Sequence, residues 1–440
     1  MIRVRTLLPV LVAATAIAGC DRWFGERDAP PLPGERISVL AHQGTLTPDP
    51  SAQTAEILLP RPTINSEWPQ QGGYANHAMH HILVGDLPQP LWRTSIGEGS
   101  DDEKRFVAAP VIAGGRVFAM DSEHRVSAFD AATGDGLWRV ELTPEEEDDG
   151  HVSGGLAYDD GILYASTGFG QVIALDAATG EDVWWRQLDG PIRSAPTARG
   201  GRVFVITVGN KIFALNAYTG EDLWTHSGIT ETASILGGAS PAVDGGVVVA
   251  PFSSGELVAL RVENGRNLWT DSLSSARRTE ELATLAHIRG RPVIDRGRVF
   301  ALSHGGILAA IDLRTGQRVW DKEIGGLESP WIAGQYLFLI TSDAELVCLD
   351  RDDGRILWVS QLPEYEDPED RTDPILWAGP LLVSDRLLVA GNHGWVLAVS
   401  PYTGDIIGQE PMPDAVTVAP VVADGSIFFL SDDAELTAYR

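Results

Sequence analysis

Short apolar runs separated by glycine turns recur along most of this chain. In each copy an apolar run ends near an Asp or Asn, a Thr-Gly-type turn follows, and another short run closes on Trp or an aliphatic residue. The clearest copies span residues 128–138, 174–184 and 214–224, and others lie around 264–269, 315–320, 353–358 and, in degenerate form, 403–407. A repeat of roughly 40 to 50 residues built from short strands is typical of β-propeller blades.

Each repeat also has a front half, made of two apolar runs that come before the Asp. The first run of the pair opens at a proline, as in Ala109-Pro110, and a tight turn such as Gly114-Gly115 leads into the second run. Proline lacks the amide hydrogen, which is tolerated where a strand begins at a sheet edge. Two strands before the Asp and one or more after it give about four, so each repeat predicts one four-stranded antiparallel blade.

The two ends of the repeat region complement each other. The last unit runs from Ala419 to Arg440 and stops before its turn and closing strand, whereas residues 89–95 form a closing strand with no blade before it. Pairing this N-terminal strand with the last unit would close a ring and leave only short outer edges exposed. The predicted fold is therefore all-β, an eight-bladed β-propeller over residues 66–440 whose last blade is closed by an N-terminal strand.

Tryptophan closes most of the repeats. A large apolar side chain at that position can bridge two neighbouring sheets, since Trp buries roughly 150 to 250 Å² while its N–H still requires a partner. The glycine of the preceding turn is expected at positive φ. Ligand binding is the alternative role for these side chains, but their repetition favours structural docking. The predicted docking residues are Trp92, Trp138, Trp184, Trp224, Trp269, Trp320 and Trp358.

The first 65 residues carry no blade repeat. A basic start, a short apolar run and small residues before Cys20 form the pattern of an export signal. We predict a lipoprotein signal peptide over residues 1–19 and lipidation of Cys20; an ordinary signal with an unrelated Cys is the alternative. A Pro-rich tether is predicted over residues 20–65, and its apolar patch at 37–40 either stays extended or docks on the propeller.

The chain carries 61 acidic and 33 basic residues, a formal net charge of −28. Such a surface repels phosphate backbones and anionic lipids, which argues against nucleic-acid binding and against direct attachment to a membrane surface. If Cys20 carries a lipid, Cys348 has no partner. It lies in an apolar run, where a buried, inert thiol is expected.

Other chemistry is weakly represented. His77, His80 and His81 lie close together, but no Cys or carboxylate completes a metal-ligand set at the usual spacing, so polar packing is the expected role. A phosphate-binding glycine loop followed by Lys and Ser or Thr is absent, as is a Gly-x-Ser-x-Gly nucleophile signal. No catalytic, metal-binding or cofactor-binding residue is predicted.

From Trp68 to Arg440 the chain resembles the tryptophan-docking repeat of the quinoprotein (PQQ-dependent dehydrogenase) superfamily. Within it, the lipoprotein signal, the eight short blades and the opening 68–73 resemble the BamB family, a component of the outer-membrane β-barrel assembly machinery. Residues 277–285 and 361–370 resemble the alphaproteobacterial branch of that family. The resemblance implies a noncatalytic scaffold that faces the periplasm and assists the insertion of outer-membrane proteins.

An active enzyme of the superfamily would need a calcium site, an acid acting as base near the quinone and, usually, a vicinal disulfide. This chain has no adjacent Cys pair. Two alternatives to the assembly scaffold stay open: a PQQ-dependent oxidoreductase, and a periplasmic binding or scaffold propeller unrelated to barrel assembly.

The resemblance also implies a partner surface. Members of the family dock on the POTRA domains of BamA through loops of neighbouring middle blades and join other subunits of the complex; unfolded outer-membrane proteins are a further class of client. The first loop aligns with 234–241, where Ile235 and Leu236 would be buried against the partner. The second aligns with 286–290, where acids are expected.

In that second loop His287 and Arg289 stand in place of acids, and Glu280 and Glu281 are the nearest compensating carboxylates. All six residues are predicted to contact BamA. The predicted location is the periplasmic face of the outer membrane, with a lipid anchor. Asp21 directly after Cys20 makes retention in the inner membrane the alternative.

Overall fold

The computed structural model describes residues 46–52, 56–86, 88–101, 108–144, 152, 154–231, 237–274 and 287–440. They belong to one compact unit, Leu46–Arg440. No helix in this described part is long and apolar enough to cross a membrane. The predicted signal peptide and Cys20 lie outside the described residues.

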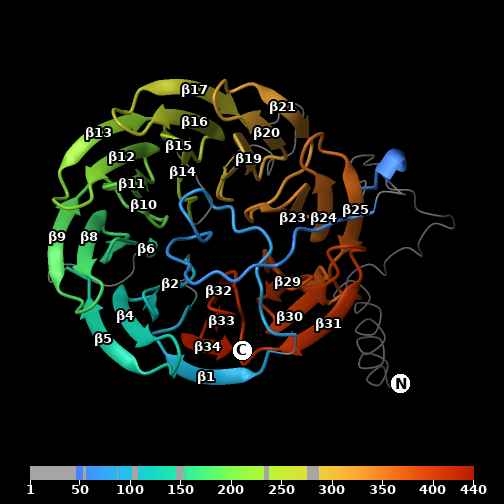
Figure 1. Cartoon of the computed structure of the whole chain (residues 1–440), viewed down its shortest axis with the longest axis horizontal. Helices are drawn as coiled ribbons and strands as arrows, with labels where there is room; N and C mark the ends of the chain where they lie inside the picture. The colour runs from blue at the N-terminus through green and yellow to red at the C-terminus, as the bar shows by residue number, and fades with distance from the viewer. Residues whose placement is uncertain are drawn as a thin grey trace, which may run out of the picture. The chain divides into compact units, whose positions relative to one another are not determined.

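Eight four-stranded antiparallel sheets form a ring (Figure 1). Blade 1 consists of β2 (Val111–Ala113), β3 (Arg116–Met120), β4 (Arg125–Asp130) and β5 (Gly136–Glu141); blade 2 of β6 (Gly155–Asp159), β7 (Ile162–Ser166), β8 (Gln171–Asp176) and β9 (Asp182–Gln187); blade 3 of β10 (Thr197–Arg199), β11 (Arg202–Thr207), β12 (Lys211–Asn216) and β13 (Asp222–Ser227); blade 4 of β14 (Ala242–Asp244), β15 (Val247–Pro251), β16 (Glu256–Arg261) and β17 (Asn267–Ser272).

Blade 5 consists of β18 (Val293–Asp295), β19 (Arg298–Leu302), β20 (Leu308–Asp312) and β21 (Arg318–Lys322); blade 6 of β22 (Trp331–Ala333), β23 (Tyr336–Ile340), β24 (Glu345–Asp350) and β25 (Ile356–Gln361); blade 7 of β28 (Trp377–Val383), β29 (Arg386–Gly391), β30 (Trp395–Val399) and β31 (Ile406–Pro411); blade 8 of β32 (Val421–Ala423), β33 (Ser426–Leu430), β34 (Glu435–Tyr439) and β1 (Pro90–Ser95). A hairpin of β26 (Tyr365–Asp367) and β27 (Thr372–Pro374) lies between blades 6 and 7 in sequence, and η2 (Pro50–Ala52) is a short 3₁₀ turn.

The ring closes as the sequence predicts. The N-terminal strand β1 pairs antiparallel with the C-terminal strand β34, with Trp92 opposite Ala438. Gln89 and Arg440 extend the ladder, each amide donating to the other's carbonyl at 2.8 and 2.9 Å. The outer strand of blade 8 therefore comes from the opposite end of the chain, and the predicted eight-bladed fold is confirmed.

Each tryptophan at the end of a repeat packs on the turn of the next blade. Its indole N–H donates to a main-chain carbonyl of that turn, and the turn glycine has positive φ and lies directly against the ring; a Cβ on Gly220 would come within 2.6 Å of Trp184. A glycine is required there because any side chain would both strain the turn and displace the indole. The pairs are Trp92–Ala131 (3.1 Å), Trp138–Ala177 (3.2 Å), Trp184–Ala217 (2.8 Å), Trp224–Val262 (2.9 Å), Trp269–Leu313 (2.8 Å), Trp320–Arg351 (2.9 Å) and Trp358–Pro401 (3.0 Å).

The interface between blades 7 and 8 lacks such a pair. Gly408 faces Ala398 on β30, the register position at which other blades carry the tryptophan. On blade 8, β34 pairs with β1 from the N-terminal side of the chain rather than with a strand joined to it by a Thr-Gly turn. Apolar side chains from both blades, including Val396 and Phe429, pack in one cluster at this seam. The seam therefore depends on aliphatic and aromatic packing.

Replacing Trp184 by Ala is expected to destabilise the fold by about 3 to 5 kcal/mol, because a nearly buried indole and its hydrogen bond are lost. Its neighbour Trp185 supplies the matched control, since 63% of that side chain is exposed compared with 9% for Trp184. Trp185→Ala should change the free energy of unfolding by no more than about 0.5 kcal/mol. Chemical denaturation measures both; equal losses would contradict the docking role.

The axis of the ring is occupied by residues 65–84 of the same chain, drawn in blue in the centre of Figure 1. This axial segment hydrogen-bonds to all eight blades in turn. Its contacts run from Asn65 with Asp424 (blade 8) through Trp68 with Ile112 (blade 1), Pro69 with Tyr158 (blade 2), Gln70 with Ala198 (blade 3), Ala75 with Val243 (blade 4), Asn76 with Ile294 (blade 5) and His80 with Trp331 (blade 6) to Ile82 with Leu382 and Ser384 (blade 7). The main chain of this segment thus ties the inner strands together.

Part of the predicted tether also contacts the ring. Asp49 pairs with Ile356 on β25, where its amide donates to the carbonyl at 2.9 Å and its carboxylate accepts from the amide at 2.7 Å. The Leu58 amide donates to the Tyr336 hydroxyl at 2.8 Å. Among the described residues, the N-terminal segment therefore lies against blade 6 before it enters the axis. The domain boundary at residue 65 stays a prediction.

Candidate functional site

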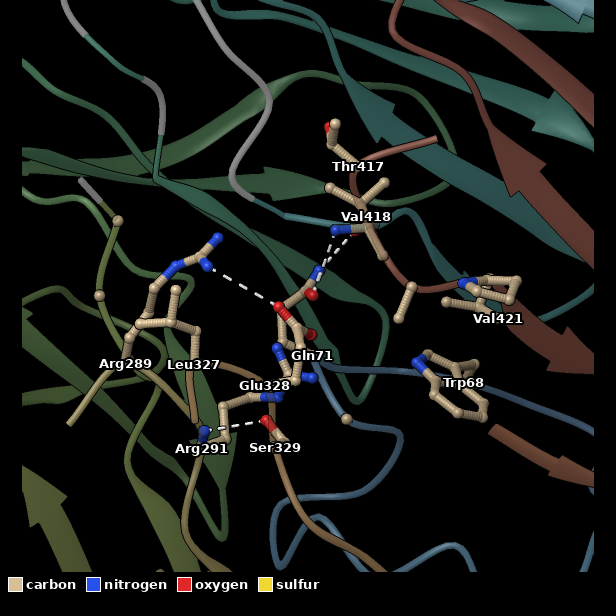
Figure 2. A pocket seen from close by; sticks show the side chains of 16 residues that line it. Trp68, Gln71, Arg289, Arg291, Leu327, Glu328, Ser329, Thr417, Val418 and Val421 are labelled. Atoms are coloured by element: carbon tan, nitrogen blue, oxygen red, sulfur yellow. Dashed lines mark hydrogen bonds and ion pairs between the residues drawn. The ribbon is translucent and has the colours of Figure 1, made fainter. Parts of the chain in front are cut away.

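The connections that lead into the inner strands line a hollow above the axial segment. The hollow has a volume of about 650 Å³, including the solvent at its open side. Its walls come from the residues just before β2, β14, β18, β22 and β32, and its floor from the axial segment. The side chains that matter are Trp68, Gln71, Arg289, Arg291, Glu328 and Ser329 (Figure 2), and the main chain of Gly237 and Gly238 also lines the hollow.

A second hollow of about 370 Å³ adjoins the first. Gly237 and Gly238 line both hollows, and His287 lines the second. Arg289 packs against the stem of the first predicted loop, since a Cβ on Gly237 would lie 3.4 Å from its Nε. The structure thus brings His287 and Arg289 to the base of the loop that carries Ile235 and Leu236.

Four of the predicted contact residues, Ile235, Leu236, Glu280 and Glu281, lie outside the described residues. Their role at a partner surface stays a prediction. What the structure describes is the site at which their loops are attached. The described chain resumes at Gly237 after the first loop and at His287 after the second. Both residues line the second hollow, so the two loops return to the ring on the same face.

Charge in the first hollow is set by three residues. Arg289 lies 3.7 Å from Glu328, a loose ion pair between partly exposed side chains. Arg291 is partly buried, and burial lowers the pKa of its guanidinium, with Glu328 opposing and Arg289 adding to that shift. Among the described residues that line this hollow, two guanidiniums and one carboxylate leave one net positive charge. The chain as a whole is strongly acidic.

Sequence reasoning missed Arg291 and Glu328. Arg291 carried a signal: the residue before the strand-opening proline is Ala, Ser or Gly in the other predicted units, and Arg only before Pro292. Glu328 had none, because its relation to Arg289 depends on how blades 5 and 6 adjoin. Gln71 belongs to the opening stretch 68–73, and it fixes the floor by exchanging hydrogen bonds with Ala109.

The three neighbouring histidines have packing roles. The His77 and His81 Nδ1 atoms each lie 2.7 Å from a main-chain carbonyl, of Pro292 and Pro60 respectively. His80 lies 3.5 Å from Asp295. Within the described ranges, no group of three His, Cys, Asp or Glu side chains is placed to hold a metal ion.

Acid should weaken the fold through two of the buried histidines. Burial and the charge of Arg291 lower the pKa of His77 to about 3, and burial lowers that of His287 to about 4. Because the unfolded chain binds these protons near pH 6.5, the stability is fully present above pH 6.5 and is lost as the pH falls towards the folded values. Between pH 6.5 and 5 each histidine removes about 1.5 kcal/mol.

Denaturant midpoints recorded from pH 7.5 to 5.0 measure this loss. In His77→Asn, whose replacement tolerates the positive φ of 61° at that position, the midpoint should fall less steeply on acidification than in the wild type, because one of these protons is no longer linked to unfolding. An unchanged slope in the variant, or stability that rises on acidification, would contradict the assignment.

The ring, the tryptophan-docking repeat and the axial segment define an eight-bladed propeller of the quinoprotein type. Residues 89–148 and 122–360 match the family model described as outer membrane protein assembly factor BamB. The chain belongs to that family.

Individual relatives agree with this assignment. The chain is 29% identical to the BamB of Alkalilimnicola ehrlichii over 208 residues, 47% of this chain and 52% of that protein. It is 28% identical to the BamB of Yersinia pestis over 358 residues, 80% of this chain and 88% of that protein. With the first of these, and with the BamB of Escherichia coli (49% of that protein), the match spans about half the relative's length.

Solved structures share the fold. The crystal structure of BamB from Moraxella catarrhalis superposes with a TM-score of 0.68 at 23% identity, covering 80% of this chain and all of the other. A quinohemoprotein alcohol dehydrogenase from Comamonas testosteroni superposes with a TM-score of 0.64 at 14% identity, covering 85% of this chain and 80% of the other. At these identities the similarity concerns the architecture alone, which is common to scaffolds and enzymes.

Proposed function

We propose that this protein is a noncatalytic scaffold of the outer-membrane β-barrel assembly complex. It docks on the POTRA domains of BamA and assists the insertion of outer-membrane proteins. The observation that carries the proposal is the match of residues 89–360 to the BamB family. A rigid ring that displays loops at one face is suited to such a role, because binding residues concentrate on loops held by a scaffold.

The face with the two hollows is the proposed docking surface. It carries the stems of both predicted loops, and Gly237 and His287 mark where those loops leave the ring. Apolar Ile235 and Leu236 would supply the buried anchors, and Glu280, Glu281, His287 and Arg289 the polar surroundings. Interfaces of this kind combine a small apolar centre with a polar rim.

Lipidation of Cys20 would hold the propeller at the periplasmic face of the outer membrane, next to the other subunits of the complex and to unfolded client proteins. Asp21 leaves inner-membrane retention as the alternative. Separation of the two membranes on a density gradient distinguishes these locations: the proposal expects the protein in the outer-membrane fraction.

Co-purification tests the proposed function. An affinity-tagged full-length chain, expressed in its own host and extracted with mild detergent, should bring down BamA and further subunits of the assembly complex. A tagged lipoprotein from the same membrane serves as the control. Recovery of the propeller with none of these subunits would count against the role.

The residues present do not fit a quinone cofactor. The axial segment hydrogen-bonds across the centre of the ring, and the chain's cysteines, Cys20 and Cys348, are not adjacent and so cannot form a vicinal disulfide. We therefore expect no saturable PQQ absorbance and no alcohol or sugar oxidation after adding PQQ and calcium to the purified protein. Stoichiometric binding with turnover would instead support the oxidoreductase alternative.

A further inference from the structure

Arg291 is an exception among the residues that precede the strand-opening prolines. Its amide donates to the Ser329 hydroxyl at 2.9 Å, so its position is tied to the start of blade 6. A Cβ on Gly72 would lie 3.1 Å from the Arg291 Nε, which shows that the guanidinium lies against the bare main chain of the axial segment. The side chain is therefore held between the floor of the first hollow and its wall.

The guanidinium has no acceptor among the described residues. Its Nε is fully enclosed without a hydrogen-bond partner, and the chain forms no ion pair with it in the described part. Leaving an enclosed charged donor unpaired is unfavourable, because the water it loses is not replaced. Because Arg291 lines the hollow, an oxygen ligand that enters at the open side would supply an acceptor for the guanidinium group.

The surrounding charges select a singly charged anion. Arg289 and Glu328 form only the loose pair at 3.7 Å, so Arg289 also retains free donor capacity. One positive charge remains after Glu328 is counted. A carboxylate neutralises it, whereas a doubly charged phosphate would leave an excess negative charge beside Glu328. A planar carboxylate also matches the fork of a guanidinium.

We propose that Arg291, assisted by Arg289, binds a carboxylate from an acidic side chain of the partner protein. This inference rests on the proposed function, since the hollow adjoins the Gly237–Gly238 stem of the expected docking loop. The apolar loop would supply most of the affinity, and the buried pair would fix the register of the complex. The scaffold thus contributes the cation and its partner the acid.

The pocket is tested first without a partner. In full-length protein labelled with ¹⁵N-arginine, the Nε–Hε resonance of Arg291 is identified by its loss in Arg291→Lys, which keeps the charge. Adding the peptide acetyl-Gly-Asp-Gly-amide should shift this resonance, and the matched Asn peptide should not. Equal effects, no effect, or a shift only with inorganic phosphate would overturn the carboxylate site.

The source of the acid is tested with purified BamA POTRA domains. Arg291→Gln is expected to weaken binding at least tenfold, and Arg289→Gln, at a side chain 32% exposed, severalfold. Arg186→Gln is the control, because this exposed arginine on β9 pairs with Asp222 away from the hollow. Melting temperatures report whether each variant is folded.

Unchanged affinity for the POTRA domains in both Arg291→Gln and Arg289→Gln would contradict the proposal that the partner supplies the carboxylate. A change in the Arg291 resonance of the isolated protein caused by Glu280→Gln with Glu281→Gln would likewise overturn it, by showing that this chain supplies the acid. If the wild-type protein does not bind POTRA domains at all, the proposed function fails, while the peptide experiment still reports on the pocket.

Discussion

A chain that begins at Gly97 is expected to lose several kcal/mol of stability and to aggregate. It lacks β1, so the edge of β34 is unpaired, and it lacks the axial segment that hydrogen-bonds to every blade. Exposed strand edges promote pairing between molecules. Because domains are typically stable by about 5 to 15 kcal/mol, the loss takes a large share of the total. Denaturant unfolding and size-exclusion chromatography measure both effects.

Two further truncations separate the contributions. A chain starting at Leu46 retains the whole compact unit and should melt like the full-length protein. A chain starting at Pro88 keeps β1 without the axial segment and should be intermediate. If the chain starting at Gly97 remained monomeric with an unchanged melting temperature, the closure of the ring by β1 would be contradicted.

Ile235→Asp combined with Leu236→Asp is expected to abolish recovery of BamA. Both side chains belong to a loop whose stem reaches the hollowed face, and buried anchors of an interface typically contribute about 2 kcal/mol or more, a roughly thirtyfold change in affinity each. The far-ultraviolet spectrum and melting temperature should stay nearly unchanged. Pull-down from solubilised membranes measures the loss.

The matched control is Ile406→Asp with Ile407→Asp. This adjacent pair lies on the outer strand β31 and is 47% and 55% exposed, so the same change of charge falls on another part of the ring. BamA recovery should survive it. Retained binding by the loop variant would place the interface elsewhere, and the acidic stretch 364–370, which includes β26, would be examined next.

The repeat was sufficient to predict the ring. Each blade is a local unit whose strands and turns follow one another in sequence, and the unpaired strand at 89–95 revealed the closure. The axial segment was not predicted, because its contacts are one or a few hydrogen bonds from Asn65, Trp68 and their neighbours to each of eight separate blades. Such contacts leave no periodic pattern in the sequence.

The candidate site was predicted only in part. The resemblance to the BamB family located the loops before β14 and β18, and the structure puts Gly237 and Arg289 side by side. Arg291 broke the repeat pattern and could have been noticed. Glu328 could not, since its position beside Arg289 arises from the packing of neighbouring blades rather than from spacing along the chain.

Calorimetric titration of the purified protein with the POTRA domains of BamA from the same organism tests the central claim most directly. The proposed scaffold predicts saturable binding with one propeller per BamA, lost in the variant carrying Ile235→Asp and Leu236→Asp and retained in the one carrying Ile406→Asp and Ile407→Asp. Absence of heat and of complex formation with the wild-type protein would contradict a scaffold that docks on BamA.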